Sequence, residues 1–416
     1  MTNKDTFDVC AGWTAGDQVI GTCYIEKARG SEVIAFSYSN TWIEKHPGFF
    51  LDPDISPVSG RQYPPQDKLC FGFLSDTAPD RWGRKLMERR EALDARNENR
   101  KARQLMESDY ILGVHDGGRQ GGLRFRDAEG RYLADRKELA APPITELRKL
   151  QQAVSQYETI GRSASDGLRI LLAPGSSLGG ARPKANVVHS DGSMWIAKFP
   201  SQNDTINVGA WEMILHDLGE ICGLRVPAAQ HISLSDQGGI YLSRRFDRFF
   251  KDGEHLRVHY ASAMSLLGET DRSVARSSYL DILSLIEEHS SGAGEDASEL
   301  WRRMVFNICT GNTDDHLRNH GFLMVNDAWR LAPAFDVNPE PEKDELSLTI
   351  DGYDNGKDIR TALDAAPLFR IHDPVKEAEK IQTAIKRFLP GRADLIYHSA
   401  RRMISSISLG VTMKGL

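Results

Sequence analysis

The chain has 416 residues, of which 40% are hydrophobic and 26% are charged, a balance that is ordinary for a globular protein in water. This length leaves room for two or three domains and a large buried core. The formal net charge of −6 at pH 7 argues against a protein that coats nucleic acid through bulk electrostatics.

The five cysteines are spread along the chain without a Cys-x-x-Cys pair or the spacing of a zinc site. This pattern indicates buried or incidental thiols in a reducing compartment. The first residues lack the apolar core of a signal peptide, and no apolar run reaches the length of about 18 residues that a membrane span needs. We therefore expect a cytoplasmic protein with no membrane contact.

The first part of the chain, to about residue 75, is predicted to be rich in strands. Its clearest alternation of apolar and polar residues lies at 21–25 and 33–38. A helix is predicted next, over 77–107, with Thr77 as its N-cap and Pro79 in its first turn.

The middle of the chain alternates between helices and strands. Residues 137–160 predict a helix, a loop rich in glycine and serine follows, and 194–199 predict a strand. The next helix carries an apolar stripe formed by Val208, Trp211, Leu215, Leu218 and Cys222. Residues 239–246 predict another strand, and from about 257 onward the pattern is mostly helical. A strand-rich first part and a helix-rich later part indicate a two-lobed α+β protein.

The most informative stretch runs from Gly311 to Asn319 and reads Gly-Asn-Thr-Asp-Asp-His-Leu-Arg-Asn. Gly311 suits the left-handed residue that ends a helix. Asp314 and Asn319 stand five residues apart, and Asp336 follows later. A hairpin is predicted between Asn319 and Asp336, with strands at 322–325 and 329–332 and a turn at Asn326-Asp327.

A loop Asp, an Asn five residues later, a hairpin and a second Asp match the order of catalytic parts in phosphotransferases of the protein-kinase type. In such an enzyme, Asp314 accepts the proton of the substrate hydroxyl. Asn319 and Asp336 hold the magnesium ions that bridge the nucleotide phosphates.

Other interpretations of this stretch stay open. Asp and Asn are common in loops because they make turns. A metal-dependent hydrolase could use a carboxylate–imidazole site formed by Asp314, Asp315, His316 and His320. Asp315 also competes for the role of base, although only Asp314 has the five-residue spacing to Asn319.

A kinase needs three further parts upstream: a loop over the phosphates, a strand Lys and a helix Glu. Residues 175–184 supply the loop, which is not a Walker A loop because Ala181 stands where the Lys must be. Lys198 ends a predicted strand, and Glu212 lies fourteen residues later beside the stripe residue Trp211. From that position Glu212 could reach inward to pair with Lys198. The ordered occurrence of all three parts favours the kinase over the hydrolase.

These residues resemble the HipA-like serine/threonine kinases, which are the toxins of bacterial type II toxin–antitoxin pairs. The resemblance runs over nearly the whole chain, including Asp80-Arg81-Trp82-Gly83-Arg84 in its N-terminal part. The later motifs are 178–184 (Leu-Gly-Gly-Ala-Arg-Pro-Lys), Ile196-Ala197-Lys198, Arg245-Phe246-Asp247-Arg248, the stretch from Gly311 to Asn319, and Phe335-Asp336-Val337.

The resemblance implies a protein-kinase-like fold with two lobes, a strand-rich N-terminal part and a mostly helical C-terminal lobe. It implies an N-terminal subdomain at 1–135, the nucleotide-binding part of the N-lobe at 136–247, and a helical C-lobe at 248–416. ATP and magnesium are the implied cofactors, with Asp314 as the catalytic base and Asn319 and Asp336 as metal ligands.

The same resemblance implies a nucleotide site. Its members are Lys198 with its partner Glu212, the hinge residues Arg244, Arg245, Phe246 and Asp247, the loop residues Ser177, Gly179, Gly180 and Ala181, and His316. In the family, a serine of the phosphate loop is autophosphorylated, which expels the loop and silences the enzyme. Ser177 aligns best with that serine, and Ser176 is the second choice. A phosphate there would add negative charge beside the phosphates of ATP.

We therefore expect an ATP- and magnesium-dependent protein serine/threonine kinase that acts as a toxin. The implied partners are a helix-turn-helix antitoxin, operator DNA reached mainly through that antitoxin, and a protein substrate, for which an aminoacyl-tRNA synthetase is one candidate. One alternative is a catalytically inactive, kinase-like partner that acts as a co-repressor with the antitoxin. Another is a kinase for a small molecule.

Overall fold

The computed structural model describes residues 5–28, 30–135, 140–160, 171, 182–235, 238–270, 277–340 and 343–390. The chain forms two compact units. Unit 1 consists of Met1–Gln202 and Asp247–Ala261, and unit 2 consists of Asn203–Phe246 and Ser262–Leu416. The three domains expected from the sequence, at 1–135, 136–247 and 248–416, stay a prediction.

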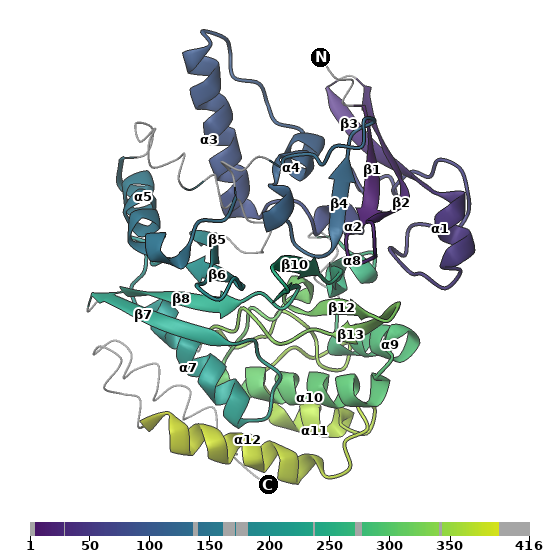
Figure 1. The fold of residues 1–416 in the computed structure, drawn as a ribbon. Coiled ribbons are helices and arrows are strands. Elements are labelled where there is room, and N and C mark those ends of the chain that lie inside the picture. The colour runs from purple at the N-terminus through teal and green to yellow at the C-terminus, as the bar shows by residue number, and fades with distance from the viewer. Residues whose placement is uncertain are drawn as a thin grey trace. The chain divides into compact units, whose positions relative to one another are not determined.

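Unit 1 opens with an antiparallel four-stranded sheet, in the order β3-β2-β1-β4 (Figure 1). Its strands are β1 (Thr6–Ala11), β2 (Gln18–Ala28), β3 (Ser31–Tyr38) and β4 (Leu123–Arg126). The predicted strands at 21–25 and 33–38 lie in β2 and β3, which pair with each other. Alternate residues of β3 are buried, as expected for a sheet with one face on a core.

The helices of unit 1 are α1 (Asn40–Lys45), α2 (Gly72–Ser75), α3 (Arg81–Asn97), α4 (Glu107–Gly113) and α5 (Leu147–Ile160). The single helix predicted over 77–107 is wrong at both ends. Asp80 is the N-cap of α3, because its side chain accepts a hydrogen bond from the Gly83 N–H at 2.7 Å. Thr77 instead donates its hydroxyl to the carbonyl of Leu74.

The end of the first predicted helix and the start of the second also need correction. The chain leaves the helical conformation after α3, and Asn99 adopts a left-handed φ of 53°. The helix predicted over 137–160 begins only at Leu147, after a 3₁₀ turn at Ile144–Glu146. Two consecutive prolines, Pro142 and Pro143, keep the preceding residues out of a helix.

The rest of unit 1 consists of two hairpins. One pairs β5 (Lys184–Val188) with β6 (Met194–Lys198), and the other pairs β9 (Arg248–Lys251) with β10 (Glu254–Arg257). β6 matches the strand predicted over 194–199. In the first hairpin, Lys184 stands directly opposite Lys198. A short strand, β11 (Tyr260–Ser262), follows the second hairpin.

Unit 2 contains two antiparallel hairpins and most of the helices. The hairpins pair β7 (Ala229–Ser235) with β8 (Gly238–Arg244), and β12 (Gly321–Val325) with β13 (Ala328–Leu331). Its helices are α7 (Val208–Ile221), α8 (Ala263–Leu266), α9 (Tyr279–His289), α10 (Ala293–Thr310), α11 (Ile359–Ala365) and α12 (Pro374–Phe388). The stripe helix and the helical C-terminal part are therefore confirmed.

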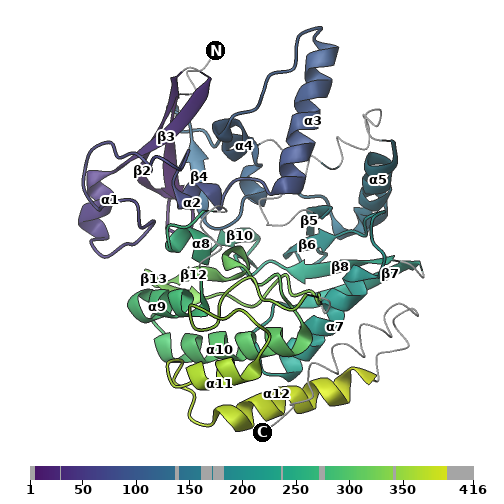
Figure 2. The same ribbon diagram turned by 180° about the vertical axis from the view of Figure 1, so that it is seen from behind.

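Helix α10 is the central helix of unit 2. It packs against α9, α11 and α12. Figures 1 and 2, which view the molecule from opposite sides, both show α11 and α12 next to α10. Its side chains are buried almost all round, and Trp301 is fully enclosed. Within the described part of the chain, no helix is long and apolar enough to cross a membrane. The predicted α+β class, with strands concentrated early and helices late, is confirmed.

Candidate active site

The loop that carries Asp314 begins where α10 ends. Gly311 has a left-handed φ of 68°, and its N–H caps the helix by donating to the carbonyl of Asn307. The next residue, Asn312, donates its side-chain amide to the Asn307 side chain at 3.0 Å. Both contacts fix the direction in which the chain leaves the helix. The helix end predicted at Gly311 is confirmed.

The predicted hairpin after this loop is also confirmed. Strands β12 and β13 pair with Val325 opposite Ala328. The two residues between them, Asn326 and Asp327, have left-handed φ values of 52° and 60°. This is the conformation of the tight turn that favours Asn and Asp between antiparallel strands. The hairpin returns the chain toward α10 before Asp336.

Asp314 and Asn319 are joined by a hydrogen bond. The side-chain amide of Asn319 donates to the backbone carbonyl of Asp314 at 2.7 Å, across the 3₁₀ turn Leu317–Asn319. The Asp314 side chain is 58% exposed, and its carboxylate lies 3.9 Å from Nε2 of His316. Asp314 is therefore held through its backbone while its carboxylate stays accessible.

The pKa of Asp314 is raised above its ordinary value. Partial desolvation by the surrounding protein is the main cause, and the negative charge of Asp336 adds to it, while His316 opposes both. The two carboxylates are thus close enough to repel each other. That Asp314 and Asp336 belong to one catalytic site stays a prediction.

Asp336 sits in a strained backbone conformation. Its φ is 56°, which a residue with a side chain adopts at a cost of about 1–3 kcal/mol. Two contacts of Asn338 hold this turn: its N–H donates to the Asn312 side chain at 3.3 Å, and its amide approaches Asp336 at 3.4 Å. The turn that carries Asp336 is thereby tied to the loop that carries Asp314.

Asp315 has a structural role, unlike its neighbour. It is 1% exposed and accepts hydrogen bonds from the hydroxyl of Tyr279 and from the N–H of Ser347. Burial raises the pKa of Asp315 to about 7. A side chain enclosed in this way cannot meet a substrate hydroxyl. Of the two candidate bases, Asp314 is the accessible one.

The alternative hydrolase site of Asp314, Asp315, His316 and His320 is not assembled. Asp315 and His320 face the interior of unit 2, whereas Asp314 and His316 are partly exposed. Burial lowers the pKa of His320 to about 3, so this imidazole stays neutral. Across the residues that the structure describes, no three side chains of His, Cys, Asp or Glu gather as a metal site.

Magnesium fits the remaining donors. Asn319 and Asp336 offer oxygen atoms, which are the ligands that this ion prefers. Magnesium sites in phosphotransferases often combine one or two protein ligands with phosphate oxygens, so a cluster of three protein carboxylates is not required. A cation at Asp336 would also relieve the repulsion between Asp336 and Asp314.

Glu212 lies in unit 2, buried on α7. Its neighbour in space is Tyr241 on β8, whose pKa is raised mainly by burial and further by the charges of Glu212 and Asp336. The charges of Glu212 and Asp336 therefore both act on the phenol of Tyr241. Lys198 ends β6 in unit 1. Its pairing with Glu212 stays a prediction.

The hinge predicted at 244–247 contains residues of different exposure. Arg244 is exposed, whereas Arg245 is buried. Phe246 packs its ring against Phe335, with centroids 5.6 Å apart, next to Asp336. Asp247 is buried and accepts a hydrogen bond from the Gly121 N–H at 2.7 Å. The roles of these four residues toward a nucleotide stay predictions.

The predicted phosphate loop and autophosphorylation sites cannot be placed. Ser176, Ser177, Gly179, Gly180 and Ala181 lie outside the described residues. The described chain resumes at residue 182, and Lys184 then forms a buried ion pair with Asp80, the N-cap of α3, at 3.1 Å. This pair anchors the first strand after the loop.

Several residues that contact the site residues were not predicted from the sequence. They are Tyr279, Asn307 and Asn312 behind the loop that carries Asp314, Tyr241 near Glu212, and Glu299 and Arg303 on α10. Only the last pair had a local signal, because Glu and Arg four residues apart on a helix face each other. The others depend on contacts between distant segments.

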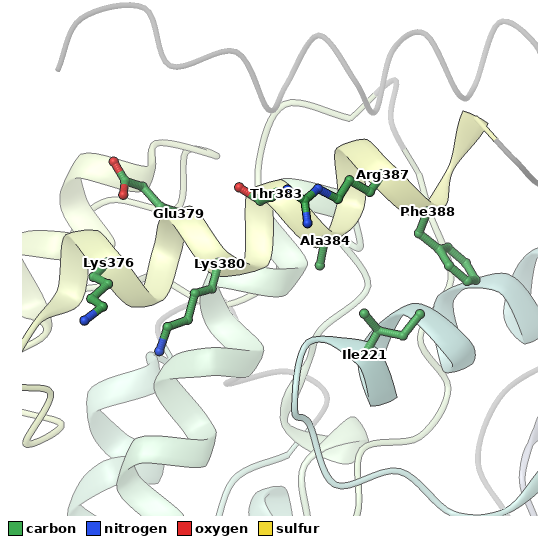
Figure 3. A pocket seen from close by; sticks show the side chains of 8 residues that line it. All are labelled: Ile221, Lys376, Glu379, Lys380, Thr383, Ala384, Arg387 and Phe388. Atoms are coloured by element: carbon green, nitrogen blue, oxygen red, sulfur yellow. The ribbon is translucent and has the colours of Figure 1, made fainter.

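A cavity of about 670 Å³ lies apart from these residues, between the C-terminal end of α7 and one face of α12. Figure 3 shows Ile221, Ala384 and Phe388 on its apolar side and Lys376, Lys380 and Arg387 around it. A smaller cavity of about 20 Å³ lies directly behind the catalytic loop, and its lining includes Arg303, Asn319 and Phe335.

Comparisons with known proteins show the family and the fold of this chain. Residues 176–391 match the family model described as the HipA-like C-terminal domain. A protein of Sinorhizobium fredii (strain NBRC 101917 / NGR234), named "Putative kinase Y4dM", is 27% identical over 158 residues. That match covers 35% of this chain and 37% of the relative, so the chain spans little more than a third of the curated relative's length.

A solved structure shares the fold of the whole chain. It comes from the HipA, HipB and operator DNA complex of the Shewanella oneidensis MR-1 toxin–antitoxin system. The TM-score is 0.66 at 16% sequence identity, and the match covers 97% of this chain and 95% of that chain. At this identity the likeness concerns the fold. The predicted HipA-like architecture is thereby confirmed.

Proposed function

Because the chain belongs to the family that has the HipA-like C-terminal domain, we propose that it is an ATP- and magnesium-dependent protein serine/threonine kinase. One observation carries the proposal. The carboxylate of Asp314 is accessible, and the side chain of Asn319, five residues later in the chain, binds the Asp314 carbonyl. The charge of Asp336 acts on the same carboxylate. This is the set of side chains that phosphoryl transfer requires on the catalytic side.

In this proposal, Asp314 orients the acceptor hydroxyl and accepts its proton. The raised pKa of Asp314 makes it a better base than an ordinary exposed carboxylate. Asn319 holds the loop through the bond from its side-chain amide to the Asp314 carbonyl, and its side-chain oxygen would serve as a metal ligand. Asn319 and Asp336 would hold magnesium, which would supply positive charge for the phosphate oxygens. Lys198 contacts the phosphates, and Glu212 orients Lys198.

We further propose that the kinase is a toxin silenced in two ways. Autophosphorylation of Ser177, or of Ser176 in its place, puts negative charge in the phosphate loop and displaces it from ATP. A helix-turn-helix antitoxin binds the chain and brings it to operator DNA. The complex of HipA, HipB and operator DNA that shares this fold supports the second part. An aminoacyl-tRNA synthetase is the candidate substrate.

The experiment is transfer of radiolabelled γ-phosphate from ATP to proteins of a cell lysate. The wild-type chain is compared with Asp314→Asn and with Asp327→Asn, a matched control in the exposed turn between β12 and β13. We expect labelled protein bands with the wild type and the control, none with Asp314→Asn, and none when EDTA removes magnesium. Label only in small molecules would indicate a small-molecule kinase, and no transfer at all would indicate a non-catalytic partner.

A further inference from the structure

We propose that Arg303, held by Glu299, is a positioning residue that fixes the loop of Asp336 relative to the loop of Asp314 and Asn319. This inference rests on the proposed kinase function and adds a residue that positions one of the proposed metal ligands, Asp336. Arg303 belongs to α10 and does not itself face the site's carboxylates. It acts on Asp336 through the backbone that leads to it.

Arg303 binds the backbone of the segment that precedes Asp336. Its Nη2 donates to the backbone carbonyl of Ala332 at 2.7 Å. Two residues later, the N–H of Ala334 donates to the carbonyl of Arg225 at 2.7 Å. These bonds hold both ends of the short segment between β13 and Asp336. Asp336 follows Ala334 by only two residues, so a shift of this segment moves its carboxylate.

Arg303 is itself held by Glu299. Oε1 of Glu299 accepts hydrogen bonds from Nε of Arg303 and from the backbone N–H of Arg225, both at 3.0 Å. Glu299 is 1% exposed and Arg303 is 3% exposed. We call Arg225, Glu299 and Arg303 the Glu299 clamp. One buried carboxylate thus ties together the two groups that grip the segment before Asp336.

The two loops have a common origin. Arg303 lies eight residues before Gly311, at which α10 ends and the catalytic loop begins. One rigid helix therefore sets the position of Asp314 and Asn319 at its end and of Asp336 through its side. Arg303, Asn319 and Phe335 also line the same cavity of about 20 Å³, which leaves room for little more than one water molecule.

This arrangement has the character of an outer shell around a metal site. Residues that orient metal ligands without touching the metal typically change metal affinity or activity by about 10–100-fold when they are replaced. Lysine cannot reproduce the contacts of Arg303, because its single ammonium lacks the planar fork that reaches Glu299 and Ala332 together. Arg303→Lys keeps the buried charge and is therefore the variant of choice.

The test measures Mn²⁺ binding by electron paramagnetic resonance, with a non-hydrolysable ATP analogue present, together with the Mg²⁺ dependence of phosphoryl transfer and the thermal midpoint. Arg303→Lys should weaken Mn²⁺ binding and raise the half-saturating Mg²⁺ concentration, each about 10-fold. Glu299→Gln, which keeps an acceptor but loses its charge, should give a smaller shift in the same direction.

The control is Arg84→Lys. Arg84 binds Glu107 at 2.8 Å in unit 1, and among the described residues it has no hydrogen bond to the Glu299 clamp. It should lower the thermal midpoint without changing Mn²⁺ affinity. The inference is overturned if both clamp variants bind Mn²⁺ as the wild type does, or if Arg84→Lys loses affinity equally. A wild type that neither binds Mn²⁺ with nucleotide nor transfers phosphate overturns the proposed kinase itself.

Discussion

Asp314 and Asp315 are adjacent in the chain but occupy opposite environments. The side chain of Asp314 is 58% exposed, whereas Asp315 is 1% exposed and bonded to the hydroxyl of Tyr279. The loop exposes the carboxylate of Asp314, and the buried Asp315 anchors the loop to unit 2. Asp314 is the accessible residue of the two, and Asp315 is the one that anchors the loop.

We expect the buried carboxylate of Asp315 to make the stability of the folded chain depend on pH. Burial raises the pKa of Asp315 from its ordinary value of 3.8 to about 7 in the folded protein. The folded chain then binds this proton more tightly than the unfolded chain. The stability that the proton contributes is complete below pH 4 and is lost as the pH rises through 7, at up to about 1.4 kcal/mol per pH unit.

The measurement is urea unfolding of the wild type and Asp315→Asn between pH 5 and pH 8. The wild type should lose stability over this range by more than the variant, which has no proton to release at this position. Asp52 in unit 1 titrates in the same range, since burial raises its pKa to about 7 as well, so Asp52→Asn serves as a separate control. If the free energy of unfolding changes equally with pH in the wild type and Asp315→Asn, the predicted titration of Asp315 is refuted.

Tyr279 predicts a second effect on stability. Its hydroxyl donates to Asp315 and accepts the amide of Asn307 at 3.0 Å, so Tyr279→Phe leaves two buried polar groups without this partner. We expect a loss of about 1–3 kcal/mol in the free energy of unfolding. Tyr353→Phe is the matched control, because Tyr353 is 94% exposed. The account fails here if the two substitutions have the same effect.

Two glycines of α10 should respond to alanine with opposite signs. Gly311 has a left-handed φ of 68°, so Gly311→Ala should destabilise by about 1–2 kcal/mol. Gly294 lies in the first turn, and a Cβ there would meet only Arg370 at 3.7 Å, an ordinary contact. Gly294→Ala should stabilise by up to about 1 kcal/mol. The measurement is the thermal midpoint of each variant compared with the wild type. If both midpoints shift in the same direction, the assignment of the helix end at Gly311 is contradicted.

Much of the site could be predicted from the sequence because its parts obey short-range rules. Gly311 ends a helix, and Asn326-Asp327 turn a hairpin. The spacing of Asp314 to Asn319 predicts a catalytic loop, which stays a prediction. Asp80 shows where such rules are ambiguous. Thr77 and Asp80 are both good N-caps, and only the folded chain decides between them.

What the sequence could not predict depends on contacts between distant residues. Arg303 meets the carbonyl of Ala332 across 29 residues, and Tyr279 meets Asp315 across 36. No periodicity in the sequence predicts such pairs. Every residue has a backbone carbonyl, so the amino-acid types do not indicate which carbonyl accepts a hydrogen bond. The opposite environments of Asp314 and Asp315 arise in the same way, since burial is a property of the assembled unit.

The central claim is that the chain transfers phosphate through Asp314. The most direct measurement is the intact mass of the purified chain after incubation with ATP and magnesium, for the wild type, Asp314→Asn and the control Asp327→Asn. The account predicts a gain of one phosphate in the wild type and the control, located by fragmentation at Ser177 or Ser176, and no gain in Asp314→Asn. An unchanged mass of a folded wild type, or an equal gain in Asp314→Asn, would contradict it.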